Sequence, residues 1–149
     1  MKQIVDMKRL EPSIREIIGA GGNVRLTVTG QSMMPTLIEH RDCVILEKPG
    51  KLKKSDIVLY QRSNGDYVLH RIVKIKKDGL ALCGDNQRCV EFPIMPEQVI
   101  AVVSAIVRKG RMIGKNDVGY KISSFVWTNF ISLRPWMFKN VMKVKNRLK

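Results

Sequence analysis

The chain of 149 residues has no long apolar run. Its longest uncharged segment of membrane-like composition, residues 122–133, contains serine, threonine and asparagine and is shorter than the roughly 20 apolar residues that cross a bilayer. The first residues include Lys2, Asp6 and Lys8, so the apolar core of a secretory signal peptide is missing as well. We therefore expect no export and no membrane span, but a cytoplasmic protein that can bind peripherally to the inner membrane face.

Cysteine and histidine are scarce too. The three cysteines, Cys43, Cys83 and Cys89, cannot all pair within one chain, and together with the two histidines they show no zinc-ligand spacing. The sequence therefore predicts unpaired cysteines in a reducing compartment, no metal site and no cofactor.

Acidic residues are rare in the last quarter of the chain. The net charge is +14, and residues 111–149 hold nine basic residues and one acidic residue. Residues 118–149 mix cations with aromatics, including Trp127 and Trp136, and predict amphipathic helices broken at Pro135. Such a segment can lie on an anionic membrane surface, or it can pack on its own domain or on a partner. Nucleic acid is the least favoured partner, because no DNA-reading motif accompanies the charge.

The rest of the chain predicts one β domain with helical ends. Apolar residues spaced by three and four over residues 3–18 predict an amphipathic helix, which Pro12 is expected to divide. Strands are expected where apolar and polar residues alternate or where short apolar runs occur, at residues 23–29, 43–46, 56–60, 67–75, 80–83 and 98–107. These patterns divide the chain into an N-terminal helical segment (1–22), a β domain (23–110) and a basic helical tail (111–149).

Two tight turns place a histidine next to an acidic loop. Asn64-Gly65 favours a hairpin whose second strand carries His70, and a second turn at Asp78-Gly79 leads into the strand that ends at residues 84–86, Gly-Asp-Asn. The sequence thus predicts that Asp85 lies near the strand of His70.

A serine lies in a turn that suits nucleophilic chemistry. Residues 30–37 read Gly-Gln-Ser-Met-Met-Pro-Thr-Leu, so the backbone can turn sharply and leave the Ser32 N–H free to bind an oxyanion. A serine hydroxyl needs a base, and the imidazole of His70 can supply one near neutral pH. Serine in such a setting is usually a turn residue only. Taken together the two motifs predict a serine peptidase whose base titrates within a unit or two of about 6.5.

The motifs resemble those of signal peptidase I and its relatives, including LexA-type self-cleaving repressors, in peptidase families S24 and S26. Residues 30–37 resemble the nucleophile box, residues 56–60 with 70–73 the second box, and residues 84–86 the third. Histidine in the second box is typical of the endoplasmic-reticulum and sporulation-type branch, whereas the common bacterial enzymes have lysine there. The resemblance covers about residues 24–107. It implies a mainly β fold, a coiled antiparallel β domain flanked by an N-terminal helix and C-terminal amphipathic helices.

The resemblance also implies a role for each matching residue. Ser32 is the expected nucleophile, His70 the general base and Asp85 the acid that orients the imidazole. Glu91 competes with Asp85 as the triad acid, because the histidine branch often has a second acidic residue at this distance after the third box. The oxyanion hole is expected to use the Ser32 backbone N–H, since Gly30 stands where some members have a serine donor.

Two neighbouring candidates receive structural roles. Strand alternation puts Arg71 on the opposite face from His70, where we expect a solvent-facing residue. His40 lies in a polar stretch and is expected in a surface loop.

The resemblance implies a serine endopeptidase that cleaves leader or signal-like peptides after small residues through an acyl-enzyme. Three alternatives remain: a noncatalytic membrane-surface adaptor, a self-cleaving LexA-like regulator, and a signal peptidase acting at the outer membrane face. The regulator would need a DNA-reading domain, for which residues 1–23 are too few. The outer-face enzyme would need a membrane anchor, which residues 1–23 do not contain.

Overall fold

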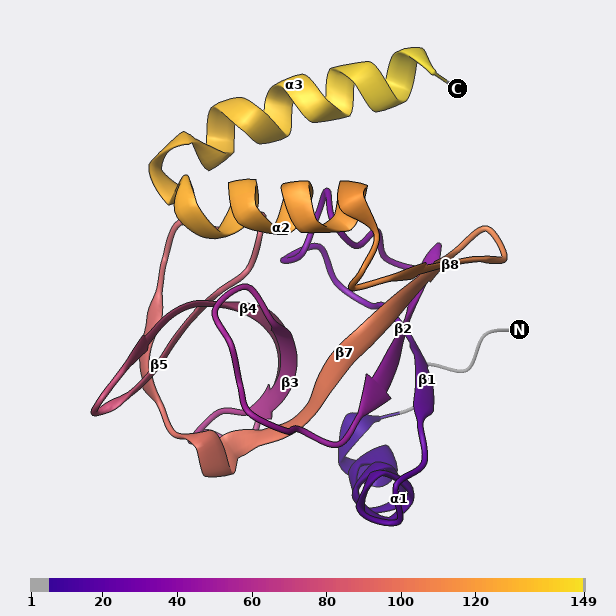
Figure 1. Ribbon diagram of the computed structural model, residues 1–149, viewed down its shortest axis with the longest axis vertical. Coiled ribbons are helices and arrows are strands. Elements are labelled where there is room, and N and C mark those ends of the chain that lie inside the picture. Colours follow the sequence, from indigo (N-terminus) through magenta and orange to yellow (C-terminus); the bar gives the residue numbers. More distant parts are fainter. Residues whose placement is uncertain (1–5, 149) are drawn as a thin grey trace.

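One antiparallel sheet organises the protein. The computed structural model describes residues 6–148, and within them eight strands join in the order β1-β2-β7-β3-β4-β5-β6, with β8 pairing with β7 (Figure 1). The strands are β1 (Val24–Thr27), β2 (Asp42–Glu47), β3 (Ile57–Gln61), β4 (Tyr67–Lys76), β5 (Gly79–Cys83), β6 (Glu91–Ile94), β7 (Val99–Arg108) and β8 (Arg111–Gly114). The predicted mainly β fold class is confirmed, whereas β6 and β8 were not foreseen.

The sheet coils because several pairings slip by a residue. Register shifts interrupt the β2–β7, β3–β7 and β4–β5 ladders. An extra residue in one strand increases the local twist, so β3, β4 and β5 curve round on themselves (Figure 1). The predicted Asn64-Gly65 hairpin joins β3 to β4, and Gly65 has φ +93°, a conformation that glycine adopts without strain. This hairpin places His70 opposite Val58.

The coiled sheet buries two large apolar clusters. One lies between α1 (Met7–Gly19) and the first part of the sheet, and it includes Ile14, Val44, Met33 and Leu37. The other fills the curl of β3 to β7. Met33 and Leu37 belong to the serine loop, so the first cluster anchors that loop on both sides of Met34 to Thr36.

Helix α1 is continuous through Pro12, so the predicted division there was wrong. Asp6 caps its first turn by accepting a hydrogen bond from the Lys8 N–H. Proline removes one hydrogen bond, the one that would reach the Lys8 carbonyl, and both residues are exposed. Water can serve that carbonyl, and the buried side chains of Ile14 and Ile18 hold the helix on the sheet.

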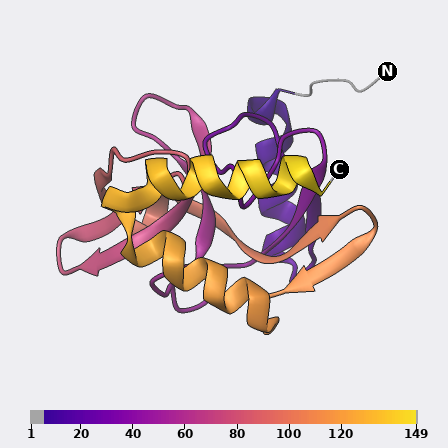
Figure 2. The same cartoon turned by 90° about the horizontal axis from the view of Figure 1, so that it is seen from above.

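The basic tail forms two helices at the end of the molecule opposite α1 (Figures 1 and 2). Helix α2 (Val118–Asn129) is followed by a 3-10 turn (Ile131–Leu133) and by α3 (Arg134–Arg147), and a further 3-10 turn (Pro96–Gln98) precedes β7. The chain breaks before Pro135 rather than at it, because proline is tolerated in a first helical turn. Within residues 6–148 no helix combines the length and apolarity needed to cross a bilayer.

The two tryptophans of the tail have different surroundings. Trp127 is 5% exposed and packs inside, whereas Trp136 is 68% exposed. The inner face of α2 is therefore covered by the rest of the fold, whereas Trp136 of α3 lies on the surface.

Candidate active site

Ser32 lies in a turn that is held from both sides. Its carbonyl accepts a hydrogen bond from the Asn86 N–H at 2.8 Å. The preceding residues are fixed by Glu39, whose carboxylate accepts from the Gly30 N–H at 3.1 Å and from the Gln31 side chain at 2.9 Å. Gly30 itself has φ +82°. These contacts fix the backbone on which the hydroxyl is presented.

The reactive groups of Ser32 are themselves unused. Neither its hydroxyl nor its backbone N–H makes a hydrogen bond to any part of the chain from residue 6 to residue 148. The side chain is half-buried. The Ser32 N–H therefore has no acceptor among the described residues and can donate a hydrogen bond to a bound group.

His70 comes from β4 and is 1% exposed. A β-carbon placed on Gly84 would lie 3.1 Å from His70 Nε2 and 2.5 Å from the Ser32 carbonyl oxygen. Only glycine leaves room for the imidazole and the serine turn to approach each other here. No hydrogen bond joins the Ser32 hydroxyl to His70 among the described residues, and such bonds are often long before substrate binds.

The other ring nitrogen of His70 meets a tyrosine and a carboxylate. Tyr60 Oη lies 3.2 Å from Nδ1 and donates to Glu91 Oε2 at 2.7 Å, while Glu91 Oε1 lies 3.9 Å from Nδ1. The hydroxyl has one proton and gives it to Glu91, so Nδ1–H donates to the hydroxyl oxygen. Nε2 then has no proton and can accept one from Ser32.

Arg62 completes this side of the imidazole. Its guanidinium forms an ion pair with Glu91, with Nε donating to Oε1 at 3.0 Å. Burial acts to raise the pKa of Glu91, but the hydrogen bonds from Arg62 and Tyr60 lower it overall. Burial and the neighbouring Glu91 raise the pKa of Tyr60, which keeps its proton. Glu91 is therefore an anion that the imidazole reaches through a neutral hydroxyl.

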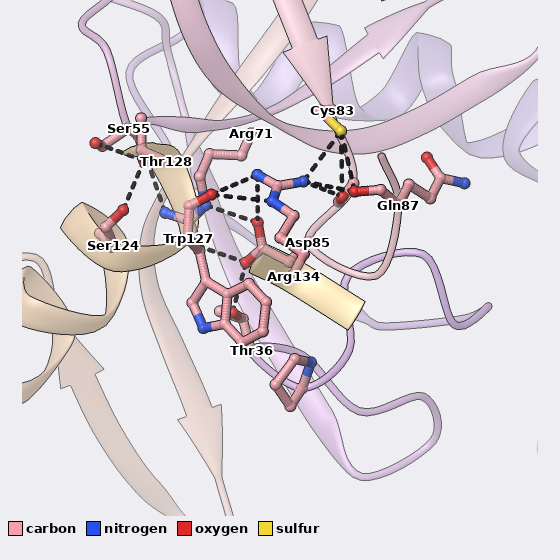
Figure 3. A network of polar contacts seen from close by, with 12 residues as sticks. Thr36, Ser55, Arg71, Cys83, Asp85, Gln87, Ser124, Trp127, Thr128 and Arg134 are labelled. Atoms are coloured by element: carbon pink, nitrogen blue, oxygen red, sulfur yellow. Dashed lines mark hydrogen bonds and ion pairs between the residues drawn. The ribbon is translucent and has the colours of Figure 1, made fainter. Parts of the chain in front are cut away.

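Asp85 has different partners. Its buried carboxylate accepts from Arg71 Nε at 2.9 Å and Nη2 at 2.8 Å, and from the Thr36 hydroxyl at 2.5 Å (Figure 3). The structure thus pairs Asp85 with Arg71, and it brings Glu91 to the imidazole through Tyr60.

Arg71 is not the solvent-facing residue that strand alternation suggested. It is completely buried, because α2 packs on the face of β4 that alternation turns away from His70. Burial acts to lower its pKa, but the neighbouring Asp85 raises it overall. Arg71 also donates to the Ser55 carbonyl at 3.0 Å, so it ties three segments of the chain together.

A family model described as Peptidase S24-like matches residues 5–107. The chain belongs to this family. No curated protein and no solved structure matches it. The matched region contains Ser32, His70, Asp85 and Glu91, whereas α2 and α3 lie outside it.

Sequence reasoning about the S24-like domain missed Tyr60. The hairpin pairs Val58 with His70 and Tyr60 with Val68, so Tyr60 is the diagonal neighbour of His70 on the same face. The Asn64-Gly65 turn sets this register. Pairing the residues before the turn with those after it would therefore have placed Tyr60 beside His70. The choice between Asp85 and Glu91 depended on which loop reaches Nδ1, which no local pattern reports.

Within the S24-like domain, the protonated His70 ring is more acidic than an ordinary imidazolium. Burial is the main cause that lowers the pKa of His70 to about 4. The Glu91 and Asp85 carboxylates act to raise this pKa, and the Arg62 and Arg134 cations act to lower it. This value is below the range expected from the sequence. At pH 7 the His70 ring is therefore neutral, which is the form that can accept a proton.

Two cavities near the serine loop differ in volume and in the residues that line them. A pocket of about 140 Å³ opens beside Ser32 between apolar side chains, among them Leu26, Val44 and Leu69. A larger cleft of about 700 Å³ lies between the tail helices and the β7–β8 hairpin, and Lys145 contributes to its wall.

Lys145 is a second basic group near the serine loop. Burial lowers its pKa to about 8, and its Nζ donates to the Pro35 carbonyl at 2.8 Å. It lines the larger cleft and not the pocket beside Ser32. A β-carbon on Gly84 would be close to both His70 Nε2 and the Ser32 carbonyl, so His70 also lies next to the serine turn.

Proposed function

We propose that the protein is a serine endopeptidase. The observation that carries this proposal is the meeting of His70 Nε2 and the Ser32 turn at Gly84, with Tyr60 and Glu91 behind the imidazole. Membership of the S24-like family supports the same reaction class.

In the proposed reaction Ser32 Oγ attacks the carbonyl carbon of the scissile peptide bond and transfers its proton to His70 Nε2. The Ser32 N–H donates to the oxyanion that forms. The tetrahedral intermediate breaks its C–N bond, and the leaving amine takes the proton from Nε2. Water, deprotonated by Nε2, then attacks the acyl carbon, and the ester C–O bond breaks as Ser32 Oγ takes the proton back from Nε2. Glu91 stabilises the transient imidazolium through the Tyr60 hydroxyl.

The pocket beside Ser32 supports a preference for small side chains before the cut. Its volume of about 140 Å³ is below the range of roughly 300–1,000 Å³ typical of sites for drug-sized ligands. Strand β1 is an edge of the sheet, where an extended peptide can pair with free backbone groups. These features suit an extended leader or signal-like segment with small residues, which is the substrate class we propose.

The test compares protein N-termini in cells that carry the native protein, the S32A variant or the S13A variant. Ser13 is an exposed serine of α1 and serves as the matched control. N-termini that follow small residues, persist with S13A and vanish with S32A support the proposal and name the substrates. Identical N-termini in all three strains contradict it and favour a noncatalytic adaptor, whereas a new N-terminus within the protein's own chain indicates self-cleavage.

We also propose that the tail helices bind an anionic membrane surface. Phe125 and Trp136 are 60% and 68% exposed, and Lys139 and Lys143 follow Trp136 by three and seven residues on the exposed side of α3. Apolar side chains beside cations suit the boundary between acidic headgroups and acyl chains.

Vesicle binding tests this second proposal. The protein should bind phosphatidylglycerol vesicles more tightly than phosphatidylcholine vesicles, and added salt should weaken the binding. The variants F125A and W136A should bind less tightly, while M112A, which removes an exposed methionine of β8, should bind like the native protein. Equal binding to both vesicle types, or unchanged binding of W136A, contradicts the proposal.

A further inference from the structure

Arg134 is a buried cation that lies outside the matched family region. It begins α3, yet it is 1% exposed. A guanidinium in such a place is stable only if its N–H groups find acceptors. Arg134 finds them on two sides: Nε and Nη2 donate to the Trp127 carbonyl, while Nη1 donates to the carbonyls of Gly84 at 2.6 Å and Gln87 at 3.0 Å (Figure 3).

The two carbonyls that accept hydrogen bonds from Nη1 belong to the first and last residues of one tight turn. The Gln87 N–H donates to the Gly84 carbonyl at 2.9 Å and closes residues 84–87. Within this turn the Asn86 N–H holds the Ser32 carbonyl at 2.8 Å, and the Asn86 side chain donates to the Gln31 carbonyl at 3.2 Å. The first residue of the turn is the glycine that borders His70 Nε2. Arg134 therefore fixes the backbone against which Ser32 and His70 are both positioned.

The helix that supplies the Trp127 carbonyl is itself fixed to the sheet. Thr128 shares a hydrogen bond of 2.8 Å with Ser55, and Lys54 donates to Asn129 at 2.8 Å. Ser55 in turn gives its carbonyl to Arg71. The guanidinium of Arg134 thus ties the turn at residues 84–87 to a helix that is held in place independently of it.

Arg134 also adds charge near the catalytic groups. Its Nη2 lies 3.9 Å from Asp85 Oδ1. The charged groups that act on the imidazole are Glu91, Arg62, Asp85 and Arg134, and the two arginines disfavour its protonation. Removal of Arg134 would therefore raise the pKa of His70 in addition to loosening the turn.

We propose that Arg134 is a positioning residue for the catalytic centre, and that the helical tail is through it a working part of the active site. This inference rests on the proposed function. Arg134 touches no reacting atom. It acts by holding residues 84–87, and through them the serine turn, in the geometry in which Nε2 can take the proton of Ser32.

The experiment uses the full chain with the variants R134M, R134K and R147M. Arg147 is an exposed cation of the same helix and is the matched control. With a peptide identified from the N-termini above, we expect R134M to lower kcat by about 100-fold, as displacements of about 1 Å do, with little change in KM. R134K, which has one nitrogen for the three carbonyls of Trp127, Gly84 and Gln87, should fall between R134M and the native protein, and R147M should retain native kcat.

Two further readouts separate positioning from loss of folding. Addition of guanidinium at millimolar concentration should partly restore kcat in an R134A variant and leave R147M unchanged. NMR titration of the His70 ring, which needs no substrate, should give a higher pKa in R134M, which removes the positive charge, and a pKa closer to the native one in R134K, which keeps it. A native kcat in R134M, or an unchanged His70 titration in folded R134M, would overturn the inference. Absence of activity in the native protein would instead refute the proposed function, while the titration would still test Arg134.

Discussion

The Tyr60 hydroxyl lies 3.2 Å from Nδ1 of His70, at the ring nitrogen that does not border Gly84. The hydroxyl donates its only proton to the Glu91 carboxylate, so its oxygen is left to accept a hydrogen bond from Nδ1–H. A direct carboxylate–imidazole contact is thereby replaced by a two-step connection.

We predict that Y60F lowers kcat by about 10- to 100-fold, because the Nδ1 proton loses its acceptor and the neutral tautomer is no longer selected. Because the buried Nδ1–H is left without an acceptor, the free energy of unfolding should fall by about 1–3 kcal/mol. Steady-state kinetics and urea unfolding check both values. E91Q should behave similarly in kinetics, and native kcat in both variants would show that the connection has no catalytic role.

Substitution of Asp85 should lower the free energy of unfolding strongly and kcat only weakly, the reverse of the pattern expected for Y60F. D85N leaves the buried Arg71 without its anion, and breaking such a pair typically costs about 3–5 kcal/mol of unfolding free energy. Urea unfolding measures this loss. At a temperature where D85N is still folded, its kcat should fall less than that of E91Q, because Asp85 hydrogen-bonds to Arg71 rather than to His70. A stable D85N variant that has lost its activity would instead make Asp85 the orienting acid.

The acid limb of kcat/KM should have an apparent pKa of about 4, because burial lowers the pKa of His70 to about that value and only the neutral ring accepts a proton. A limb near pH 8 would point to Lys145, whose pKa is lowered to about 8, and would contradict His70 as the base.

The same shift affects stability. The folded protein binds fewer protons at His70 than the unfolded chain, whose imidazole titrates near 6.5. The free energy of unfolding should therefore fall by up to about 3 kcal/mol as the pH drops from about 6.5 through about 4. Urea unfolding at several pH values measures the slope. H70Q should reduce this slope, and an unchanged slope in H70Q would contradict the assignment.

G84A should lower kcat/KM by about 100-fold or more, because the added methyl group would meet the Ser32 carbonyl at 2.5 Å and move the serine turn. G50A is the control, since a β-carbon at Gly50 has no neighbour within 4 Å among the described residues. Peptide cleavage by both variants decides the matter, and equal rates would mean that the turn can shift without cost.

L69A should widen the pocket beside Ser32 and relax its selectivity for small residues. The ratio of kcat/KM for an alanine peptide over a leucine peptide, differing only at the residue before the cut, should fall by about 10-fold or more. An unchanged ratio in L69A would place the selectivity elsewhere.

Much of the fold and two of the site residues followed from local patterns. The Asn64-Gly65 turn determined the β3–β4 hairpin and hence the position of His70, and the Gly-Pro setting of Ser32 determined a turn with a free N–H. These are local properties, since they depend on backbone conformations and on residues a few positions apart.

The sequence by itself therefore determined which residues can attack and which can accept a proton. Only the tertiary structure decided their partners: Glu91 reaches His70 through Tyr60, Asp85 pairs with Arg71, and Arg134 comes from the tail to hold the turn at Gly84. These contacts join segments that meet only because the sheet coils and α2 covers β4. The same packing buries His70, which lowers its pKa, and buries Arg71. Neither burial has a local signature in the chain.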